Sequence, residues 1–270
     1  MKRVAVIGCG NIGTEIARAV DKGVVRARLV ALYDIEPGRC RRLASGLERE
    51  RPLIAESLGQ LLGQRPDLVV EAASQEAVRQ YGEQILKRGI DLVVLSVGAL
   101  LDSETRERLR GAAEATGARI HVPSGAVAGL DALKSMSLVG VDRLVLRTRK
   151  PPRALAGAPG ARGVDLEGLR EPRLIYRGPA SEAVKLFPAN VNIAAALALA
   201  AGREPLVEIV ADPTVDRNIH EVEAESKVSR LHIVVENVPS PRNPRTSYLA
   251  LLSIIDLLRS LTGSVYIIAG

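Results

Sequence analysis

A glycine-rich segment near the amino terminus constrains this chain more than any other feature. Gly8, Gly10 and Gly13 have the spacing GxGxxG, between an apolar run at residues 4–7 and a helical pattern at residues 12–21. A lone GxGxxG is a weak signal. A strand before it and a helix after it, however, are the context of a βαβ unit that binds a dinucleotide. The sequence therefore predicts a nucleotide-binding turn at this place.

Each position of the turn has a physical role in such a unit. Gly8 permits the tight turn out of the strand, Gly10 lets a pyrophosphate approach the backbone, and Gly13 lets the helix pack closely on the strand. The first N–H groups of the helix, around Asn11 and Ile12, have no partner within the helix and carry a partial positive charge. We therefore predict that all five of these residues contact the cofactor.

A second apolar run, residues 29–33, ends in an acid that predicts which dinucleotide is preferred. Asp34 follows the turn by about 20 residues, the spacing at which a carboxylate accepts hydrogen bonds from the adenosine ribose. Its charge repels a 2′-phosphate and so favours NAD. Arg39, Arg41 and Arg42 follow closely and can reach such a phosphate. We expect NAD to be preferred and NADP to be used measurably.

Strands and helices alternate through the first half of the chain. The predicted strands are residues 4–7, 29–33, 68–71, 91–96 and 118–122. The predicted helices are residues 12–21, 38–47, 76–87 and 103–116. Apolar strands separated by helices are typical of a parallel sheet that is covered on both faces. Further cofactor contacts are expected where these strands end, at Ala73, Ser74 and Ser96.

The pattern changes after residue 122. A helix is predicted at residues 130–136, a loop at residues 150–163, and a turn with a buried helix at residues 187–201. The strands expected here are residues 143–149, 173–176, 206–211 and 232–236. This mixture is typical of an α+β domain.

The last helical pattern covers residues 248–261 and is apolar around most of its circumference. Asn243 is a good N-cap and Pro244 suits a first helical position, so we expect the helix to start there and to return to the first domain. The expected fold class is α/β, with a Rossmann-type doubly wound parallel sheet plus a second α+β catalytic domain. The expected boundaries are 1–122, with 243–270 returning, for the NAD(P)-binding domain and 123–242 for the catalytic and dimerisation domain.

Composition argues against several classes of partner. The net charge is +6, but the chain has one Phe, no Trp and five Tyr, so aromatic platforms for nucleic-acid bases are scarce. The longest apolar run, residues 193–201, is too short to span a bilayer. The strand pattern begins almost at once, so we expect no signal peptide. Cys9 and Cys40 have no metal-ligand spacing. A cytoplasmic protein with reduced thiols, and with no nucleic-acid or membrane partner, is the simplest interpretation.

Three histidines are available for proton transfer. His220 follows a predicted strand among turn-forming polar residues, where catalytic groups are commonly presented. We expect it to exchange protons at neutral pH, and the alternative is a surface loop histidine. His121 ends a predicted strand and is interpreted as structural, and His232 fits the alternation of a strand. No pair of them has ligand spacing, so no metal site is expected.

Two amide side chains interrupt an otherwise apolar stretch. Asn190 and Asn192 lie in the segment FPANVNIAA, which begins at Phe187. Polar amides in such a place need hydrogen-bond partners. The carboxamide of a nicotinamide is one such partner, and a helix N-cap is the alternative for one of the two. We predict that this pair contacts the cofactor.

Four segments in the second half resemble those of the L-aspartate dehydrogenase family, in the family's order. They are residues 123–131 (PSGAVAGLD), 187–194 (FPANVNIA), 211–220 (ADPTVDRNIH) and 236–247 (ENVPSPRNPRTS). The resemblance covers nearly the whole chain. One departure is Arg245, where the family pattern has a lysine, and another is a longer loop at residues 150–163.

The resemblance implies NAD(P)-linked, reversible oxidative deamination of L-aspartate to iminoaspartate, oxaloacetate and ammonia. It implies a catalytic histidine at His220, and cofactor contacts at Ala126 and around Asn190. Candidates to bind the two substrate carboxylates are Ser124, Arg245, Thr246 and Ser247. We expect a homodimer, because exposed β faces in such second domains often pair.

Two alternatives stay open at this point. One is a related reductase of the dihydrodipicolinate reductase or homoserine dehydrogenase type. The other is a non-catalytic NAD(P)-binding sensor, which would keep the glycine-rich turn but need no catalytic histidine.

Overall fold

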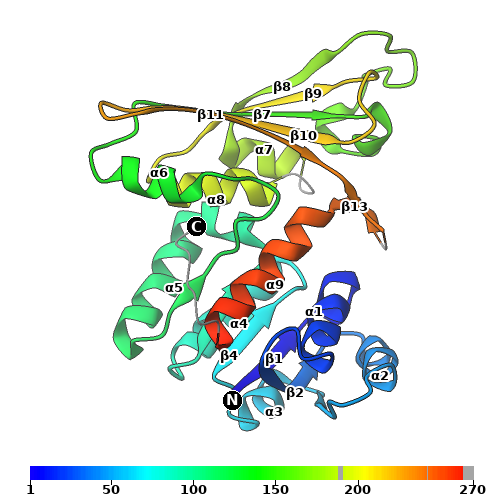
Figure 1. Ribbon diagram of the computed structural model, residues 1–270, viewed down its shortest axis with the longest axis vertical. Helices are drawn as coiled ribbons and strands as arrows, with labels where there is room; N and C mark the ends of the chain where they lie inside the picture. The colour runs from blue at the N-terminus through cyan, green and yellow to red at the C-terminus, as the bar shows by residue number, and fades with distance from the viewer. Residues whose placement is uncertain (188–190, 242, 264–270) are drawn as a thin grey trace. The chain divides into compact units, whose positions relative to one another are not determined.

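The computed structural model describes residues 1–187, 191–241 and 243–263, and the chain forms two compact units. Among the described residues, the first unit comprises Met1–Pro123 and residues 251–263, and the second comprises Ser124–Ala250. Each unit is built around its own sheet (Figure 1). Among the helices described, none has both the length and the apolar character needed to cross a membrane.

A six-stranded sheet forms the centre of the first unit, in the order β3-β2-β1-β4-β5-β6. Its strands are β1 (Lys2–Ile7), β2 (Ala27–Tyr33), β3 (Leu53–Ala55), β4 (Leu68–Glu71), β5 (Asp91–Val94) and β6 (Ile120–His121). Every pairing is parallel. The direction of strand order reverses between β1 and β4. In doubly wound sheets, ligands bind outside the carboxyl ends of the strands at such a point.

The helices of the first unit pack on both faces of this sheet. They are α1 (Asn11–Asp21), α2 (Pro37–Ser45), α3 (Leu58–Gly63), α4 (Gln75–Leu86), the 3-10 helix η1 (Val97–Leu101), α5 (Ser103–Thr116) and α9 (Tyr248–Thr262). On one face, Ile254 and Leu258 of α9 join a buried core with Val4 and Ile16. The prediction that the C-terminal helix returns to the first domain is therefore confirmed.

Local signals in the sequence explain where several of these helices start and end. The side chain of Ser74 caps α4 by accepting the amide of Ala77, and that of Asp102 caps α5 by accepting the amide of Thr105. Gly117 ends α5 in the left-handed conformation that glycine adopts at no steric cost.

The second unit contains a five-stranded mixed sheet in the order β11-β10-β7-β9-β8. Its strands are β7 (Arg143–Lys150), β8 (Arg173–Pro179), β9 (Leu206–Ala211), β10 (Asn218–Glu225) and β11 (Arg230–Asn237). The β7–β9 pair is parallel and the other pairs are antiparallel. A short ladder of β12 (Pro239–Ser240) and β13 (Asn243–Ser247) precedes α9. The short 3-10 helices η2 (Pro152–Ala154) and η3 (Pro159–Ala161) lie in the expected loop.

The two faces of the second sheet differ in character. Helices α6 (Leu130–Ser137), α7 (Ala180–Leu186) and α8 (Val191–Ala201) lie on one face (Figure 1). We call this the inner face. Side chains alternate along β10, so that His220, Val222 and Ala224 are buried on the inner face and the intervening glutamates point outwards.

Two sequence expectations about secondary structure were wrong. The turn-forming residues before His220 do form a turn at residues 212–217, but His220 itself lies on β10 and not in a loop. The outward glutamates of β10 make it polar by composition, but arginines of β7 pair with them. Asn243 does not start the last helix, because residues 243–247 form β13 against β12 and α9 begins at Tyr248.

Candidate active site

The glycine-rich turn lies between β1 and α1, and its three glycines differ in how closely other atoms approach them. Gly8 has φ +96°, and a Cβ built there would lie 2.5 Å from the carbonyl oxygen of Ala72. A Cβ on Gly13 would lie within van der Waals overlap of the Gly8 carbonyl oxygen, at 1.9 Å. At Gly10, by contrast, a Cβ would meet no atom within 4 Å. Two glycines are thus required by packing, and the third leaves room for a ligand.

Asp34 lies directly beside this turn and is almost fully buried. Its Oδ2 accepts the amide of Cys9 at 2.7 Å, and its Oδ1 accepts the amide of Glu36 at 2.9 Å. The carboxylate therefore joins the turn to the start of α2. This position is the one predicted for a ribose-binding acid.

A cavity of about 370 Å³ opens at the carboxyl ends of β1, β2 and β4. Its lining includes Gly8, Gly10, Asp34, Arg39, Ala73 and Ser74. A wider hollow of about 730 Å³ lies at the opposite, amino-terminal ends of β1, β4 and β5, around Lys2, Asp67 and Asp91. Since doubly wound sheets bind ligands at their carboxyl ends, the smaller cavity is the candidate cofactor site.

Glu71, which sequence reasoning missed, organises two of the loops at this edge. It ends β4 and is 1% exposed. Its Oε1 accepts the amides of Ala73 and Ser74 at 2.8 and 2.9 Å and the hydroxyl of Ser96 at 2.9 Å. Its Oε2 accepts the amide of Ser96 at 3.0 Å. Burial raises the pKa of Glu71 although these hydrogen bonds oppose the rise. The only signal in the sequence that could have identified Glu71 was its position as an acid at the end of an apolar strand.

His220 lies on the inner face of β10 and is 4% exposed. Its Nδ1 lies 3.0 Å from the hydroxyl of Thr148, the residue opposite it on β7, in a hydrogen bond that either group can donate. Burial, together with the charge of Lys150, lowers the pKa of His220 to about 3. This burial excludes the alternative of a surface loop histidine. The lowered pKa also differs from the expectation of titration near neutral pH, because burial in the free protein favours the neutral imidazole.

Lys150 and Asp212 are two further polar groups at this end of the second sheet, and sequence reasoning missed both. Lys150 ends β7 and is 6% exposed, and burial lowers its pKa to about 8. Asp212 is fully buried, and its amide donates to the carbonyl of Lys150 at 2.8 Å. Burial raises the pKa of Asp212, but hydrogen bonds from Thr214 and Arg149 outweigh it, so the net shift is downwards.

Asn237 connects the end of β11 to a predicted cofactor contact. Its Nδ2 donates to the carbonyl of Ala126 at 3.1 Å, and both residues are buried. The side-chain oxygen of Asn237 is buried and has no hydrogen-bond partner among the described residues. In the register of the sheet, Asn237 pairs with Asn218, so it shares the inner face with His220. An acceptor in this position can receive a hydrogen bond from a ligand.

The remaining predicted residues have varied positions. Asn11 and Ile12 open α1, Ser124 is half-buried, Asn192 lies exposed in the first turn of α8, and Ser247 is buried at the end of β13. Asn190 and the side chains of Arg245 and Thr246 lie outside the described residues. His121 is held by Asp91, whose Oδ2 lies 3.2 Å from its Nε2, which agrees with a structural role.

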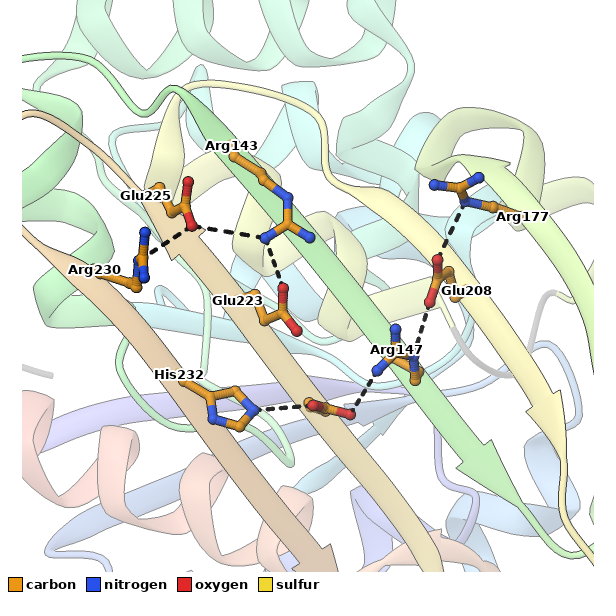
Figure 2. A network of polar contacts seen from close by, with 9 residues as sticks. Arg143, Arg147, Arg177, Glu208, Glu223, Glu225, Arg230 and His232 are labelled. Atoms are coloured by element: carbon orange, nitrogen blue, oxygen red, sulfur yellow. Dashed lines mark hydrogen bonds and ion pairs between the residues drawn. The ribbon is translucent and has the colours of Figure 1, made fainter. Parts of the chain in front are cut away.

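The outer face of the second sheet carries a network of ion pairs across all five strands. Arg147 pairs with Glu208 and with Glu221, and Glu221 in turn contacts His232. Figure 2 shows Arg147 beside Glu208, with Arg177 on the far side of Glu208. Ligand atoms of Glu221, Glu223 and His232 lie within 4.8 Å of one another, a grouping capable of holding a metal ion. Because both glutamates already pair with arginines of β7, this grouping is explained as part of the network.

The turn, the acid at the end of β2 and the cavity beside them define a dinucleotide-binding unit, and the chain is an NAD(P)-dependent oxidoreductase with a second, mixed-sheet domain. Residues 8–123 match the family described as homoserine dehydrogenase, NAD binding domain, and residues 131–261 match the family described as aspartate dehydrogenase, C-terminal.

Individual relatives identify the family. The chain is 48% identical to the L-aspartate dehydrogenase of Methanosarcina barkeri, over 99% of both chains, and 45% identical to that of Methanosarcina mazei, also over 99% of both. The crystal structure of aspartate dehydrogenase from Thermotoga maritima superposes with a TM-score of 0.77 at 31% identity, over 99% of both chains. The chain belongs to the L-aspartate dehydrogenase family.

Proposed function

We propose that this chain oxidises L-aspartate to iminoaspartate and hydrolyses the imine to oxaloacetate and ammonia, with His220 as the group that moves protons. The observation that carries the proposal is the buried, neutral imidazole of His220, held by Thr148 and lying in the field of Lys150. A neutral imidazole can accept a proton and later return it, which is the task of a general acid/base.

NAD(P), when bound, accepts the hydride that leaves the Cα of L-aspartate. His220 acts after the imine has formed. Its imidazole accepts a proton from the water that attacks the imine carbon, and it donates a proton to the nitrogen that leaves as ammonia. The hydrogen bond to Thr148 holds the ring in one orientation during both transfers.

Binding of the substrate changes the pKa of His220. A base with a pKa of about 3 is weak at neutral pH, whereas general acid/base catalysis works best with a pKa near the working pH. L-aspartate brings two carboxylates, and negative charge beside an imidazole favours its protonated form. Binding of the substrate therefore raises the pKa of His220 towards the working range. The two carboxylates bind to donors among Ser124, Arg245, Thr246 and Ser247, and Lys150 contributes a cation.

NAD is the preferred cofactor and NADP is used to a smaller extent. Asp34 supports this preference, because a buried carboxylate at the ribose position repels a 2′-phosphate. Arg39 lines the same cavity, where it pairs with Glu36 at 2.7 Å, and it can turn to a 2′-phosphate. The phosphates bind at Gly8, Gly10, Asn11, Ile12 and Gly13, with further cofactor contacts at Ala73, Ser74, Ser96, Ala126, Asn190 and Asn192.

Residues 1–122 together with α9 from Leu251 act as the cofactor domain, and the chain from residue 123 through β13 acts as the catalytic and dimerisation domain of a cytoplasmic homodimer. The outer face of the second sheet is the surface that pairs. It carries both signs of charge, which suits a self-complementary contact, and it exposes Leu174 and Val234, which are 51% and 53% exposed.

Steady-state kinetics test the proposed reaction. We expect L-aspartate to reduce NAD, with oxaloacetate and ammonia as products, and we expect oxaloacetate with ammonia to oxidise NADH. Activity with homoserine or with a dihydrodipicolinate substrate, in the absence of activity with aspartate, would identify a related reductase. NAD binding without turnover of any of these compounds would identify a sensor.

A further inference from the structure

The two cysteines of the chain meet beside the glycine-rich turn, although they are far apart in the sequence. Cys9 stands between Gly8 and Gly10, and Cys40 lies in the middle of α2. Both are buried, at 5% and 0% exposure, and their Sγ atoms are 2.8 Å apart. A disulfide bond has a length of about 2.05 Å, so an approach of less than about 1 Å would join the two sulfurs.

We propose that Cys9 and Cys40 form a reversible dithiol–disulfide pair that, when oxidised, clips the phosphate-binding turn to α2. The position of the pair supports a link of this kind. The amide of Cys9 donates to Asp34 at 2.7 Å, and α2 carries Arg39, which lines the cofactor cavity. The bond would therefore connect the turn, the ribose-binding acid and one wall of the cavity.

The oxidant is a small peroxide, because both sulfurs are buried and a bulky disulfide reagent has no access to them. The sulfur of Cys40 attacks one oxygen of hydrogen peroxide. The O–O bond breaks, one water leaves, and Cys40 becomes a sulfenic acid. The sulfur of Cys9 then attacks that of Cys40, the S–S bond forms, the S–O bond breaks and a second water leaves. Two thiols and one peroxide thus give one disulfide and two waters.

The surroundings favour Cys40 as the first nucleophile. A hydrogen bond from the thiol of Cys9 lowers the pKa of Cys40, and burial opposes this effect. Because the thiolate is the reactive form, the sulfur that is stabilised as a thiolate attacks first. The second sulfur is already in contact and resolves the sulfenic acid before further oxidation.

The clip should stabilise the first unit without closing the cofactor site. The sulfurs move little, and Gly10, where a ligand has room, lies outside the bond. Cross-linking residues this far apart in sequence restricts the unfolded chain, so we expect Tm to rise by about 5–10 °C. We expect the dissociation constant for NAD to change less than about threefold.

The experiment uses the full chain, reduced and desalted, and treated with a small excess of hydrogen peroxide. Expected results are the loss of both titratable thiols in denaturant, a monomer mass lower by two hydrogens, and the rise in Tm. Because the sulfurs are buried, dithiothreitol is added in denaturant, where it should restore both thiols and the original mass and, after refolding, the original Tm. Cys40→Ser is the matched control, and it should show none of these changes.

Three results would overturn the proposal. The first is persistence of both thiols in the treated wild-type protein. The second is a mass gain from added oxygen in place of the loss of two hydrogens. The third is loss of NAD binding on oxidation, measured by titration of the treated protein with NAD, because a clip that preserves the turn must leave the site able to bind. None of these readouts depends on turnover of aspartate, so they stand apart from the test of the proposed reaction.

Discussion

The cofactor edge of the first sheet and the His220 region of the second sheet are built on opposite principles. At the cofactor edge, the carboxylates of Asp34 and Glu71 are buried, and backbone amides of nearby loops satisfy them. Around His220, the polar groups come from strands far apart in sequence, and Thr148 is 72 residues away from its imidazole partner. One site is organised by local segments, whereas the other exists only when strands pair.

The electrostatic cost of the two regions also differs. In the first site, hydrogen bonds, most of them from backbone amides, oppose the rise in the pKa of Glu71 that burial causes. In the second, burial lowers the pKa of His220 to about 3 and that of Lys150 to about 8, so each base is held where its charged form is disfavoured. Groups kept at such a cost tend to mark functional positions. The comparison supports the proposal that the first region binds the cofactor and that the second transfers protons.

Replacing His220 tests this division with the largest expected effect. His220→Ala should lower kcat for aspartate oxidation by about 10²–10⁴, the range of general acid/base catalysis, while the dissociation constant for NAD stays unchanged. Stopped-flow and equilibrium titration would measure the two quantities. His121→Ala is the matched control. If His121→Ala loses turnover while His220→Ala retains turnover, proton transfer belongs to the first region and the comparison fails.

Two glycine variants separate packing from binding within the first region. Gly10→Val should fold normally, because a Cβ there meets no atom within 4 Å, but it should raise the dissociation constant for NAD about 100-fold. Gly13→Ala should instead lower the free energy of unfolding by about 1–3 kcal/mol, because its Cβ overlaps the Gly8 carbonyl. Urea denaturation of both variants measures the free energy of unfolding, and NAD titration measures the dissociation constant. Equal NAD affinity in Gly10→Val and wild type would remove the phosphate-binding assignment.

The pH dependence of stability probes the buried imidazole. An unfolded histidine binds a proton below about pH 6.5, whereas folded His220 stays neutral down to about pH 3. The unfolded state therefore binds more protons in this window, and stability falls as the pH falls through it. Between pH 7.5 and pH 5 this loss amounts to about 2 kcal/mol.

Two histidine variants separate the loss of stability caused by His220 from the effect of other titrating groups. His220→Gln should lack it, while His232→Gln, which alters a histidine exposed on the outer face, should keep it. Urea denaturation at each pH measures the difference. Identical slopes for wild type and His220→Gln would show that the imidazole is not held neutral.

Glu71 tests whether acids organise the cofactor edge. Glu71→Gln leaves N–H donors of the loops after β4 and β5 without an acceptor, so the free energy of unfolding should fall by about 1–2 kcal/mol and the KM for NAD should rise. Glu107→Gln, an exposed acid on α5, should change neither quantity. Thermal denaturation and steady-state kinetics provide the readout. An unchanged KM in Glu71→Gln would limit Glu71 to a purely structural role.

Asp34 gives the smallest expected effect. Asp34→Ser removes the charge that repels a 2′-phosphate, so the ratio of kcat/KM for NADP to that for NAD should rise about tenfold. Arg39→Gln should move the ratio in the opposite direction. Steady-state kinetics with NAD and with NADP measure this ratio. A wild-type preference for NADP would show that the arginines control this pocket.

Much of the first region could be predicted because its signals are local. Gly8, Gly10 and Gly13 share one short segment, and Asp34 ends the next strand. The capping side chains of α4 and α5 stand next to the helices that they start. Turn chemistry, capping and an apolar strand depend on neighbours within a few residues, so a single sequence reveals them.

The second region was predicted less completely for a physical reason. The sequence, through its resemblance to a family, pointed to His220, but not to its strand, its burial or its pKa. The turn-forming polar residues that precede His220 suggested a loop, since nothing in their own segment reveals the strands that pair with β10. Asp212 and Asn237 lie in segments that resemble the family, but no local pattern singled out either of them or Lys150.

By itself, the sequence determined the glycine-rich turn, the acid at the end of β2, the alternation of strands and helices, and the membership of a family, because each depends on short segments or on their order. Only the tertiary structure decided that His220 is a buried neutral base beside Lys150, that Glu71 binds two loops together, and that Cys9 meets Cys40. Such properties arise from burial and from charges that strand pairing brings together across the chain. Sequence separation carries no information about either.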